Sequence, residues 1–414
     1  MRSPFIRLLV SCLILGVASP LWAGQQVDIY RADTLVKSQS EIERNAASRA
    51  TFGEVIVRVS GQRNALDHPN IKEATAKAQN YLFGFSYKSS AEKMTVDGKT
   101  FPAIGLQLNY APQAIEQLLR QSQLPVWPAQ RPKVLVWLVA KDQAGIHLAV
   151  DPADLHAMQA QAQYRGLPLE FADAAVVAAD LWNLNRDTIE SVSARYKADA
   201  ILVGRYTPYS IGTIPAPGMG DTAVTAASGL PQGQGPWLGD WQLFHAGNTQ
   251  SYTDETPEIK GLLASVVDRA ADYFANQYAI TPTRQGPQAI LLHVGNITGF
   301  GEFKQVQAYL DDLAMVQRME VVKVNAEGML VRLTTEGDAK LLVTTLALGR
   351  RLVPAQDNSA AKPVAVAGNG EVDAEAMAEL DQALANEQAA GIVPSSAPAN
   401  AGNTITSLMY VWQK

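Results

Sequence analysis

The sequence predicts a mixed α/β protein, with α+β character, built from three small sandwich-like modules in series. Its 414 residues exceed the roughly 100 to 200 residues of one domain. Prolines at 125, 128 and 132, and again at 282 and 287, mark two linkers. Between the linkers, strand-like apolar runs are interleaved with amphipathic helical stretches. The expected modules are 24–128, 133–281 and 288–414.

The N-terminus has the layout of a secretory signal peptide over residues 1–23. Arg2 and Arg7 give a positive start, the apolar run that follows is short for a bilayer span, and cleavage is expected after Ala23. Cys12 has the spacing of a lipoprotein processing box, but the apolar run continues past it, so simple cleavage is favoured over lipidation or an N-terminal anchor. No later segment is apolar enough to span a membrane. We therefore expect a periplasmic mature chain.

Composition excludes several classes of protein. Charged residues make up 18% and hydrophobic residues 47%, a balance that favours folding over disorder. Without Arg2 and Arg7, the 34 basic residues fall to 32 against 40 acidic ones, a net charge of −8 that disfavours nucleic-acid binding. Cys12 is the one cysteine. A cleaved chain would therefore lack disulfides, thiolate nucleophiles and cysteine metal sites.

The first module is predicted to be a small sheet covered by helices. Apolar residues at helical spacing predict a long helix over 41–59 that ends at Ser60-Gly61. The other elements expected here are a helix over 69–79, strands over 81–87 and 104–110, and a helix from Pro112. The rings of Tyr81, Phe83, Phe85 and Tyr87 alternate along the first strand. We expect them to face the long helix as core, the alternative being an exposed strip that binds a glycan or a peptide.

The middle module is predicted to contain a partly parallel sheet. Continuous apolar runs over 133–139 and 198–206 indicate strands buried on both faces. Between them we expect a helix over 152–164, a strand over 167–171 and a helix over 187–196, which is a βαβ order. Residues 211–236 are rich in Gly, Pro and Thr and predict a mobile loop. A strand over 237–244 and a helix over 257–279 complete the module.

The third module is predicted to be ferredoxin-like. A strand over 290–294, a helix over 303–313, a hairpin over 319–333 and a helix over 338–346 give a βαββα order. The order lacks one strand, and we expect residues 408–412 to supply it. The intervening residues 355–402 hold 15 alanines with scattered Pro, Gly and acidic residues, which predicts a flexible insert.

Four stretches carry a resemblance: ASRATFGEVIVRVSG, YKADAILVGRY, WLGDWQLF and the closing MYVW. With the expected export, they resemble the domain-of-unknown-function 2066 family of secreted Gram-negative proteins over nearly the whole mature chain. That resemblance implies no catalytic residues. At fold level alone, the middle module is similar to periplasmic modules of penicillin-binding-protein activators and of the Tol system, which implies docking onto envelope proteins.

No catalytic constellation stands out. The five histidines show no zinc-protease spacing, and His293 is expected to be a core residue of an apolar strand. Gly295 to Gly301 lacks the Lys-Ser/Thr pair of a P-loop and indicates a tight strand-to-helix turn. The paired carboxylates Asp311 and Asp312 are interpreted as solvated or capping charges. No catalytic, metal or cofactor site is therefore predicted.

The favoured function is a non-enzymatic docking or assembly factor of the cell envelope that contacts other envelope proteins. Trp237 and Trp241, beside the predicted loop, form the candidate contact surface, and Tyr206 and Tyr209 are assigned to it. Packing of the tryptophans against helix 257–279 is the alternative. The runner-up function is a small-molecule or glycan binding module with a cleft between the first two modules. A hydrolase that uses Asp or Glu with His comes third.

Overall fold

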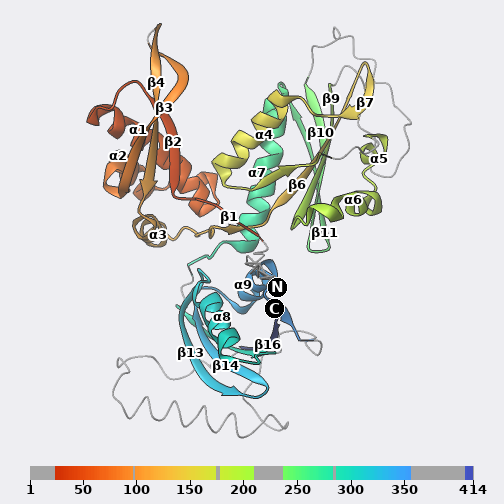
Figure 1. The fold of residues 1–414 in the computed structure, drawn as a ribbon. Helices are drawn as coiled ribbons and strands as arrows, with labels where there is room; N and C mark the ends of the chain where they lie inside the picture. The colour runs from red at the N-terminus through yellow and green to blue at the C-terminus, as the bar shows by residue number, and fades with distance from the viewer. Residues whose placement is uncertain are drawn as a thin grey trace, which may run out of the picture.

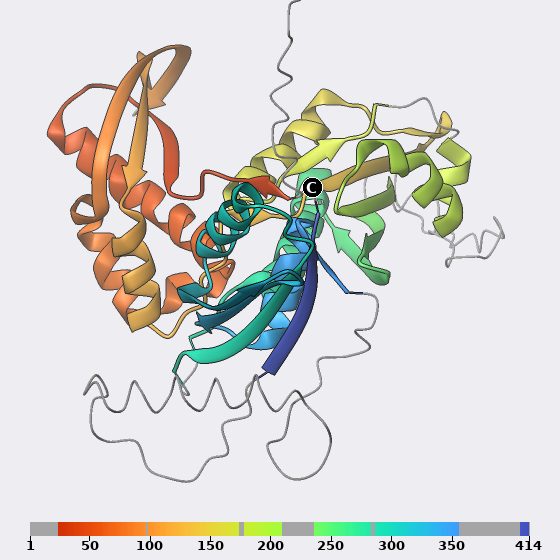
Figure 2. The same cartoon turned by 60° about the horizontal axis from the view of Figure 1, so that its bottom comes forward.

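The protein is a mixed α/β molecule with a separate sheet in each predicted module. The structure, a computed structural model, describes residues 24–96, 98–173, 178–208, 236–282, 286–355 and 406–413. In Figure 1 the first and middle modules lie side by side at the top and the third lies below them. Figure 2 brings the third module forward, between the other two. The predicted signal peptide, most of the predicted loop and nearly all of the predicted insert lie outside the described residues.

The first module packs helices on one face of an antiparallel sheet of order β2-β4-β3. Ser40 caps α1 through a hydrogen bond from the Glu43 amide, and Gly61 ends it in a left-handed conformation. Phe52, Val55, Ile56 and Val59 form the buried stripe of α1, as the helical period predicts. Its elements are β2 (Arg31–Val36), α1 (Glu41–Ser60), α2 (Pro69–Ala76), β3 (Leu82–Val96), β4 (Lys99–Tyr110) and α3 (Pro112–Gln121).

Strands β3 and β4 form a long hairpin that projects from the module (Figure 1). The prediction that four aromatic residues of its first strand face the core is wrong for two of them. Phe83 is 70% exposed and Phe85 is 46% exposed. The β3–β4 register shifts between Leu82 and Gly84, so Phe83 is an extra residue that leaves the pleat. The bulge cannot be seen in the alternating sequence pattern.

The middle module has a mixed sheet of order β11-β10-β9-β6-β7, with β8 beside β6. Strand β6 pairs in parallel with both β8 and β9, which confirms the predicted βαβ units. Two strands were missed, β7 and β11, because polar residues break their apolar pattern. The strands are β6 (Val134–Asp142), β7 (Gly145–Leu148), β8 (Leu169–Phe171), β9 (Ala200–Pro208), β10 (Trp237–His245) and β11 (Asn248–Thr256).

Helices cover both faces of this sheet, which explains the continuous apolar run of β6. Val134, Val136 and Leu138 pack with α4 and α7, whereas Leu135, Trp137 and Val139 pack with α5 and α6. In Figure 1, α4 and α7 lie on the side that faces the first module. The helices are α4 (Pro152–Arg165), α5 (Ala178–Trp182), α6 (Arg186–Ser193) and α7 (Ile259–Tyr278).

The third module has a sheet of order β13-β14-β12-β16-β15 with two helices packed on one face. The four strands β13, β14, β12 and β16 stand in the spatial order of a ferredoxin-like sheet. The module contains β12 (Gln288–Gly295), α8 (Phe300–Asp311), β13 (Val316–Asn325), β14 (Gly328–Thr335), α9 (Ala339–Gly349), β15 (Leu352–Pro354) and β16 (Thr406–Trp412).

The closing strand lies where it was expected, but its direction differs. β16 lies beside β12 and pairs with it in parallel, whereas a ferredoxin-like fourth strand runs antiparallel to the first. The unpredicted strand β15 runs antiparallel to β16 at the sheet edge. Strand β16 therefore lies between β12 and β15. Residues 355–405 separate it from β15 in sequence, which is enough chain to return to the start of the sheet and pair in parallel with β12.

A buried arginine joins the first and middle modules. Arg131 is fully buried and stacks with its guanidinium carbon 3.7 Å from the Trp127 ring centroid. Its guanidinium donates only to backbone oxygens: Arg58 at 2.6 Å, Arg165 at 2.9 Å, and Pro128, Gly166 and Trp127 at 3.0 Å. Because these oxygens belong to α1, the linker and the end of α4, one side chain fixes three segments together.

A buried ion-pair network lies next to this arginine. Arg165 is fully buried and pairs with Asp268 at 2.7 Å and with Asp272 at 2.5 Å, both on α7. Arg63 from the first module also reaches Asp268, at 2.9 Å. Arg165 also donates to the Gly61 carbonyl of the first module at 2.8 Å, so the buried charges of the middle module are partly satisfied by the first one.

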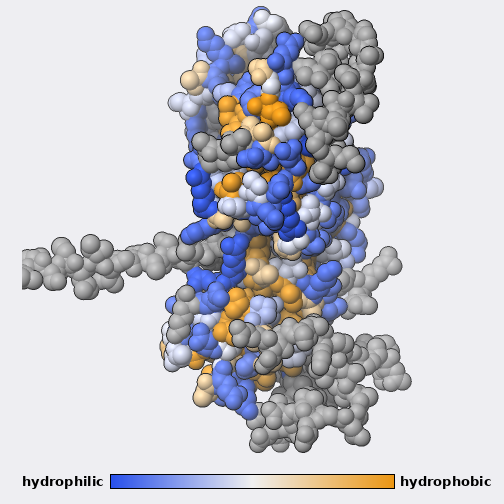
Figure 3. Space-filling view, turned by 90° about the vertical axis from the view of Figure 1, so that its right-hand side faces the viewer, coloured by the Kyte–Doolittle hydropathy of each residue, from blue (hydrophilic) through white to orange (hydrophobic). Residues whose placement is uncertain are grey.

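The third module is attached mainly through apolar contacts. Ile280, just after α7, belongs to the core of the third module, and Leu348 of α9 belongs to that of the middle module. Two ion pairs at the edge of this contact also hold the third module: Arg350 pairs with Asp199 of the middle module at 2.9 Å, and Glu336 pairs with Arg120 of the first module at 3.0 Å. Figure 3 shows hydrophobic residues where the middle module, above, meets the third module. Among the described residues, no helix is both long and apolar enough to span a bilayer.

Candidate functional site

The predicted contact surface is mostly core, which corrects the sequence interpretation. Trp241 is fully buried, and its ring lies over Gly204, where an added Cβ would come within 2.0 Å of it. Tyr206 is 3% exposed and donates to Asp154 at 3.0 Å. Trp237 is half-buried and contacts Tyr206, with ring centroids 6.0 Å apart. The two tryptophans pack toward α7, as the alternative held, and Tyr209 lies outside the described residues.

The other residues singled out in the sequence form no catalytic group. Thr298, in the glycine-rich turn after β12, bonds Glu302 through its amide and its hydroxyl, a local cap for α8. His293 lies half-buried on β12. No cluster of three or more His, Cys, Asp or Glu residues that could hold a metal is found in the described part of the chain.

A hollow of the described structure lies where all three modules meet. It has a volume of about 1060 Å³, just above the roughly 300 to 1,000 Å³ of small-molecule sites. Helices α8 and α9 form one wall, and the end of α7 forms the opposite one. The remaining wall is a two-stranded ribbon in which β1 (Gln25–Gln26) pairs with β5 (Gln130–Arg131). We call this hollow the junction pocket.

The junction pocket has an apolar floor and a polar rim. The floor consists of side chains that are almost fully buried: Tyr278, Ile280, Met315, Leu348 and Trp412. The rim consists of more exposed polar side chains: Gln26, Gln130, Gln305, Asp312, Arg350, Arg351 and Gln413. A ligand with an apolar body and polar edges fits such a lining.

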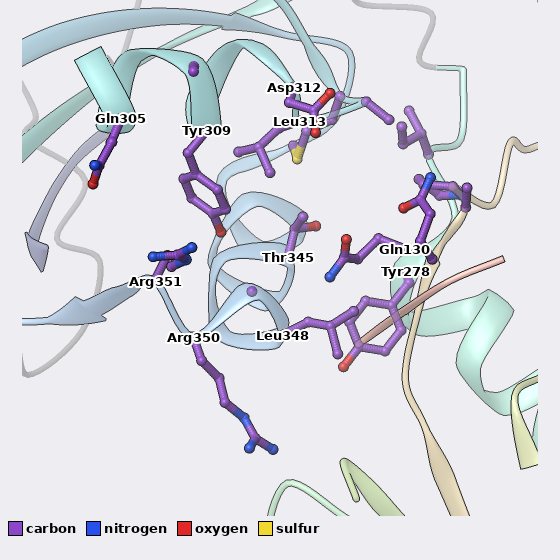
Figure 4. Close-up of a pocket in the computed structure, with 18 of the residues that line it drawn as sticks. Gln130, Tyr278, Gln305, Tyr309, Asp312, Leu313, Thr345, Leu348, Arg350 and Arg351 are labelled. Carbon is purple, nitrogen blue, oxygen red and sulfur yellow. The ribbon is translucent and has the colours of Figure 1, made fainter. Parts of the chain in front are cut away.

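One end of the pocket is formed by a tyrosine, an arginine and a tryptophan. Figure 4 shows Tyr309 and Arg351 together at one end, with Gln130 and Tyr278 at the other. The Arg351 guanidinium carbon is 5.6 Å from the Trp412 ring centroid, and the Tyr309 and Trp412 rings are 5.8 Å apart. Tyr309 can lie against the end of α9 because residue 349 is glycine, where a Cβ would come within 2.1 Å of its hydroxyl. This corner is therefore formed by α8, by the residues that follow α9 and by the end of β16.

The opposite end borders a histidine held between two tyrosines. His245, at the end of β10, has Nδ1 3.2 Å from the Tyr273 hydroxyl and Nε2 3.0 Å from the Tyr278 hydroxyl. Burial lowers the pKa of His245, and Asp199 offsets part of this effect. A neutral imidazole can donate to one hydroxyl and accept from the other, so this group is satisfied as it stands. Its bonds hold Tyr278 in the pocket wall.

Sequence reasoning missed the junction pocket. The runner-up function placed a cleft between the first and middle modules, where the structure has the buried Arg131 and Arg165. The pocket residues come from distant segments such as 26, 130, 278, 309 and 412, and no local pattern links them. Asp312 was the residue near it that the sequence singled out, as a solvated or capping charge. It follows the last residue of α8, and its exposed side chain lies on the rim.

The first module matches a known protein family model. Residues 23–128 match the model of a domain of unknown function, DUF8605. This match corrects the resemblance to the domain-of-unknown-function 2066 family, because the matching family is a different one and nothing supports the other. No curated protein matches the chain.

Proposed function

We propose that the protein is a non-enzymatic binding protein of the cell envelope that holds a small ligand in the junction pocket. The observation that carries this proposal is one pocket of about 1060 Å³ bounded by segments of all three modules. Binding sites form preferentially at domain interfaces, where rigid modules enclose a space that none of them forms alone. Export by the N-terminal segment 1–23 is part of the proposal.

The lining supports binding and offers no reaction. Asp312 and Arg351 are the rim charges without an ion pair in the described residues, and no histidine is among the described residues that line the pocket. An acid/base reaction needs two groups positioned on one reacting centre. The pocket has instead the apolar floor and convergent polar groups of a binding site.

The test is a thermal-shift panel on residues 24–414 with sugars, amino acids, peptides and amphiphiles of each charge. Ala308, an exposed residue of α8 that lines the pocket, is changed to Trp to fill it. Ala160→Trp, at an exposed position of α4 outside the pocket, is the matched control. A binder raises the melting temperature by mass action, so we expect an increase in wild type and Ala160→Trp and none in Ala308→Trp. Increases that Ala308→Trp retains, or none for any class, overturn the proposal.

Docking onto another envelope protein is the second candidate, and the projecting β3–β4 hairpin favours it. Phe83 and Phe85 on this hairpin are exposed large apolar side chains, and the Arg44 guanidinium carbon lies 4.3 Å from the Phe85 ring centroid. Exposed aromatic residues with a neighbouring arginine are typical anchors of protein interfaces. This surface replaces the Trp237 and Trp241 surface.

A photo-crosslinking residue placed at Phe83 tests this candidate in cells. The control is the same residue at Thr95, an exposed position nearer the hairpin tip. Docking predicts one discrete adduct with an envelope protein from position 83, weakened by Phe85→Ser. Equal and diffuse labelling from both positions would rule out docking through this hairpin.

A further inference from the structure

The junction pocket contains a cation without an anionic partner. In the part of the chain that the structure describes, the Arg351 side chain makes no ion pair and no hydrogen bond, although it is half-buried. Its neighbour Arg350 differs, because it pairs with Asp199 at 2.9 Å. The Arg351 guanidinium carries five donors, which water or an anionic ligand in the pocket can satisfy. An anionic group of a ligand in the pocket can therefore provide the partner that Arg351 lacks among the described residues.

A second donor lies beside Arg351. The Tyr309 hydroxyl is buried and has no hydrogen-bond partner in the structure. Burial raises the pKa of Tyr309 to about 12, although the charge of Arg351 lowers it in part. The hydroxyl therefore keeps its proton at neutral pH and can donate. Two donors, one of them charged, converge on one corner of the pocket (Figure 4).

The floor next to this corner is apolar. Met315 and Leu348 are 2% and 6% exposed and line the pocket together with Trp412 and Ile280. A sugar would leave hydroxyl groups unpaired against these side chains, whereas an acyl chain loses nothing there. Each methylene that leaves water for such a floor tightens binding about three- to fourfold.

We infer that the ligand is an amphiphilic anion, an acyl chain that ends in a carboxylate or phosphate bound by Arg351 and Tyr309. The inference rests on the proposed function and names its ligand class. The chain lies over Leu348 and Met315 and points toward Gln130 at the other end. Charge-assisted hydrogen bonds from the guanidinium fix the headgroup.

The experiment is a calorimetric titration of residues 24–414 with twelve-carbon amphiphiles below their micellar concentrations. Dodecanoate and dodecyl phosphate are the two anions, dodecyl maltoside is neutral, and dodecyltrimethylammonium is cationic. We expect the anions to bind at least about tenfold more tightly than the others. Octanoate is expected to bind more weakly than dodecanoate. The affinity for dodecanoate compared with that for dodecyl phosphate shows which headgroup the pocket prefers.

Two variants separate the headgroup contact from the pocket. Arg351→Gln is expected to reduce dodecanoate affinity at least about tenfold and to leave dodecyl maltoside unchanged, and Tyr309→Phe to reduce it about threefold or more. Arg318→Gln, on the exposed edge strand β13, is the control. Equal affinity for all headgroups, or no effect of Arg351→Gln, overturns the inference. If the inference fails but Ala308→Trp still removes binding, the proposed function stands without this ligand class. If Ala308→Trp keeps the binding of the anions, both the inference and the proposed function are overturned.

Discussion

Single residues decide which side chains reach the surface. Trp241 is large and lies beside a polar, glycine-rich stretch, so its sequence context predicts a surface anchor as readily as a core residue. The structure buries it because Gly204 and Gly239 leave space for its ring on one face of the sheet. A glycine inside a strand pattern indicates the close approach of another group. That signal was present in the sequence, but it does not name the group.

His245 predicts a pH dependence at the residue scale. Its folded pKa is lowered by burial, so below its unfolded pKa of about 6.5 the unfolded chain binds a proton that the folded chain does not. Stability from this group is therefore complete above that pH and falls as the pH decreases, by at most about 1.4 kcal/mol per pH unit. Denaturant unfolding of wild type and His245→Gln between neutral pH and pH of about 5 measures the difference.

His147 is the control for this effect. His147→Gln replaces an exposed histidine and leaves the contacts of His245 with Tyr273 and Tyr278 in place, so this variant should keep the loss that belongs to His245. Wild type and His245→Gln losing stability in parallel as the pH falls would contradict the assignment.

Helices and strands could be predicted where the apolar residues follow a regular pattern along the sequence. The helix predicted over 41–59 is α1, and the buried run predicted over 133–139 is β6, because a stripe and a continuous apolar run each have one stable solution. The bulge at Phe83 and the direction of β16 were not predictable. Both depend on pairing with a strand distant in sequence, which local periodicity does not encode.

The closing strand is expected to be essential to the third module. A chain truncated before Thr406 loses Leu408, Tyr410 and Trp412 from the core and leaves one edge of β12 unpaired. Three such side chains contribute roughly 5–9 kcal/mol of burial, comparable to the whole stability of a domain. Hydrogen exchange should show β12 and β14 unprotected and α1 and α4 still protected.

Removal of Lys414 alone is the matched control and should change no exchange rate, because the last residue of β16 is Trp412. A truncated chain whose β12 amides stay protected would show that the parallel pairing contributes little.

Buried contacts of Arg131, which we call the clasp, join the first and middle modules, and the third module is attached beside them. The clasp depends on Arg131, whose five donors satisfy backbone oxygens of three segments. Composition and linker prolines predicted that modules exist. They could not predict that an arginine in the linker would be buried without a carboxylate, or that a pocket would form from six separated segments.

Arg131→Leu is expected to destabilise the first and middle modules together by about 3–5 kcal/mol, because buried oxygens lose their donors. Scanning calorimetry should show one shared transition for these two modules that moves to lower temperature, with the third-module transition unchanged. Arg49→Leu, an exposed position of α1, should leave both transitions in place. Separate responses of the first and middle modules would show that the clasp does not couple them.

The central claim is that the junction pocket binds a ligand, and a crystal structure of residues 24–414 with 12-bromododecanoate tests it most directly. The bromine marks the end of the chain and the carboxylate marks its head. The account predicts a carboxylate beside Arg351 and Tyr309 and a bromine anomalous peak over the apolar floor near Ile280. A pocket that contains only solvent, with the bromine absent or bound elsewhere on the surface, would contradict it.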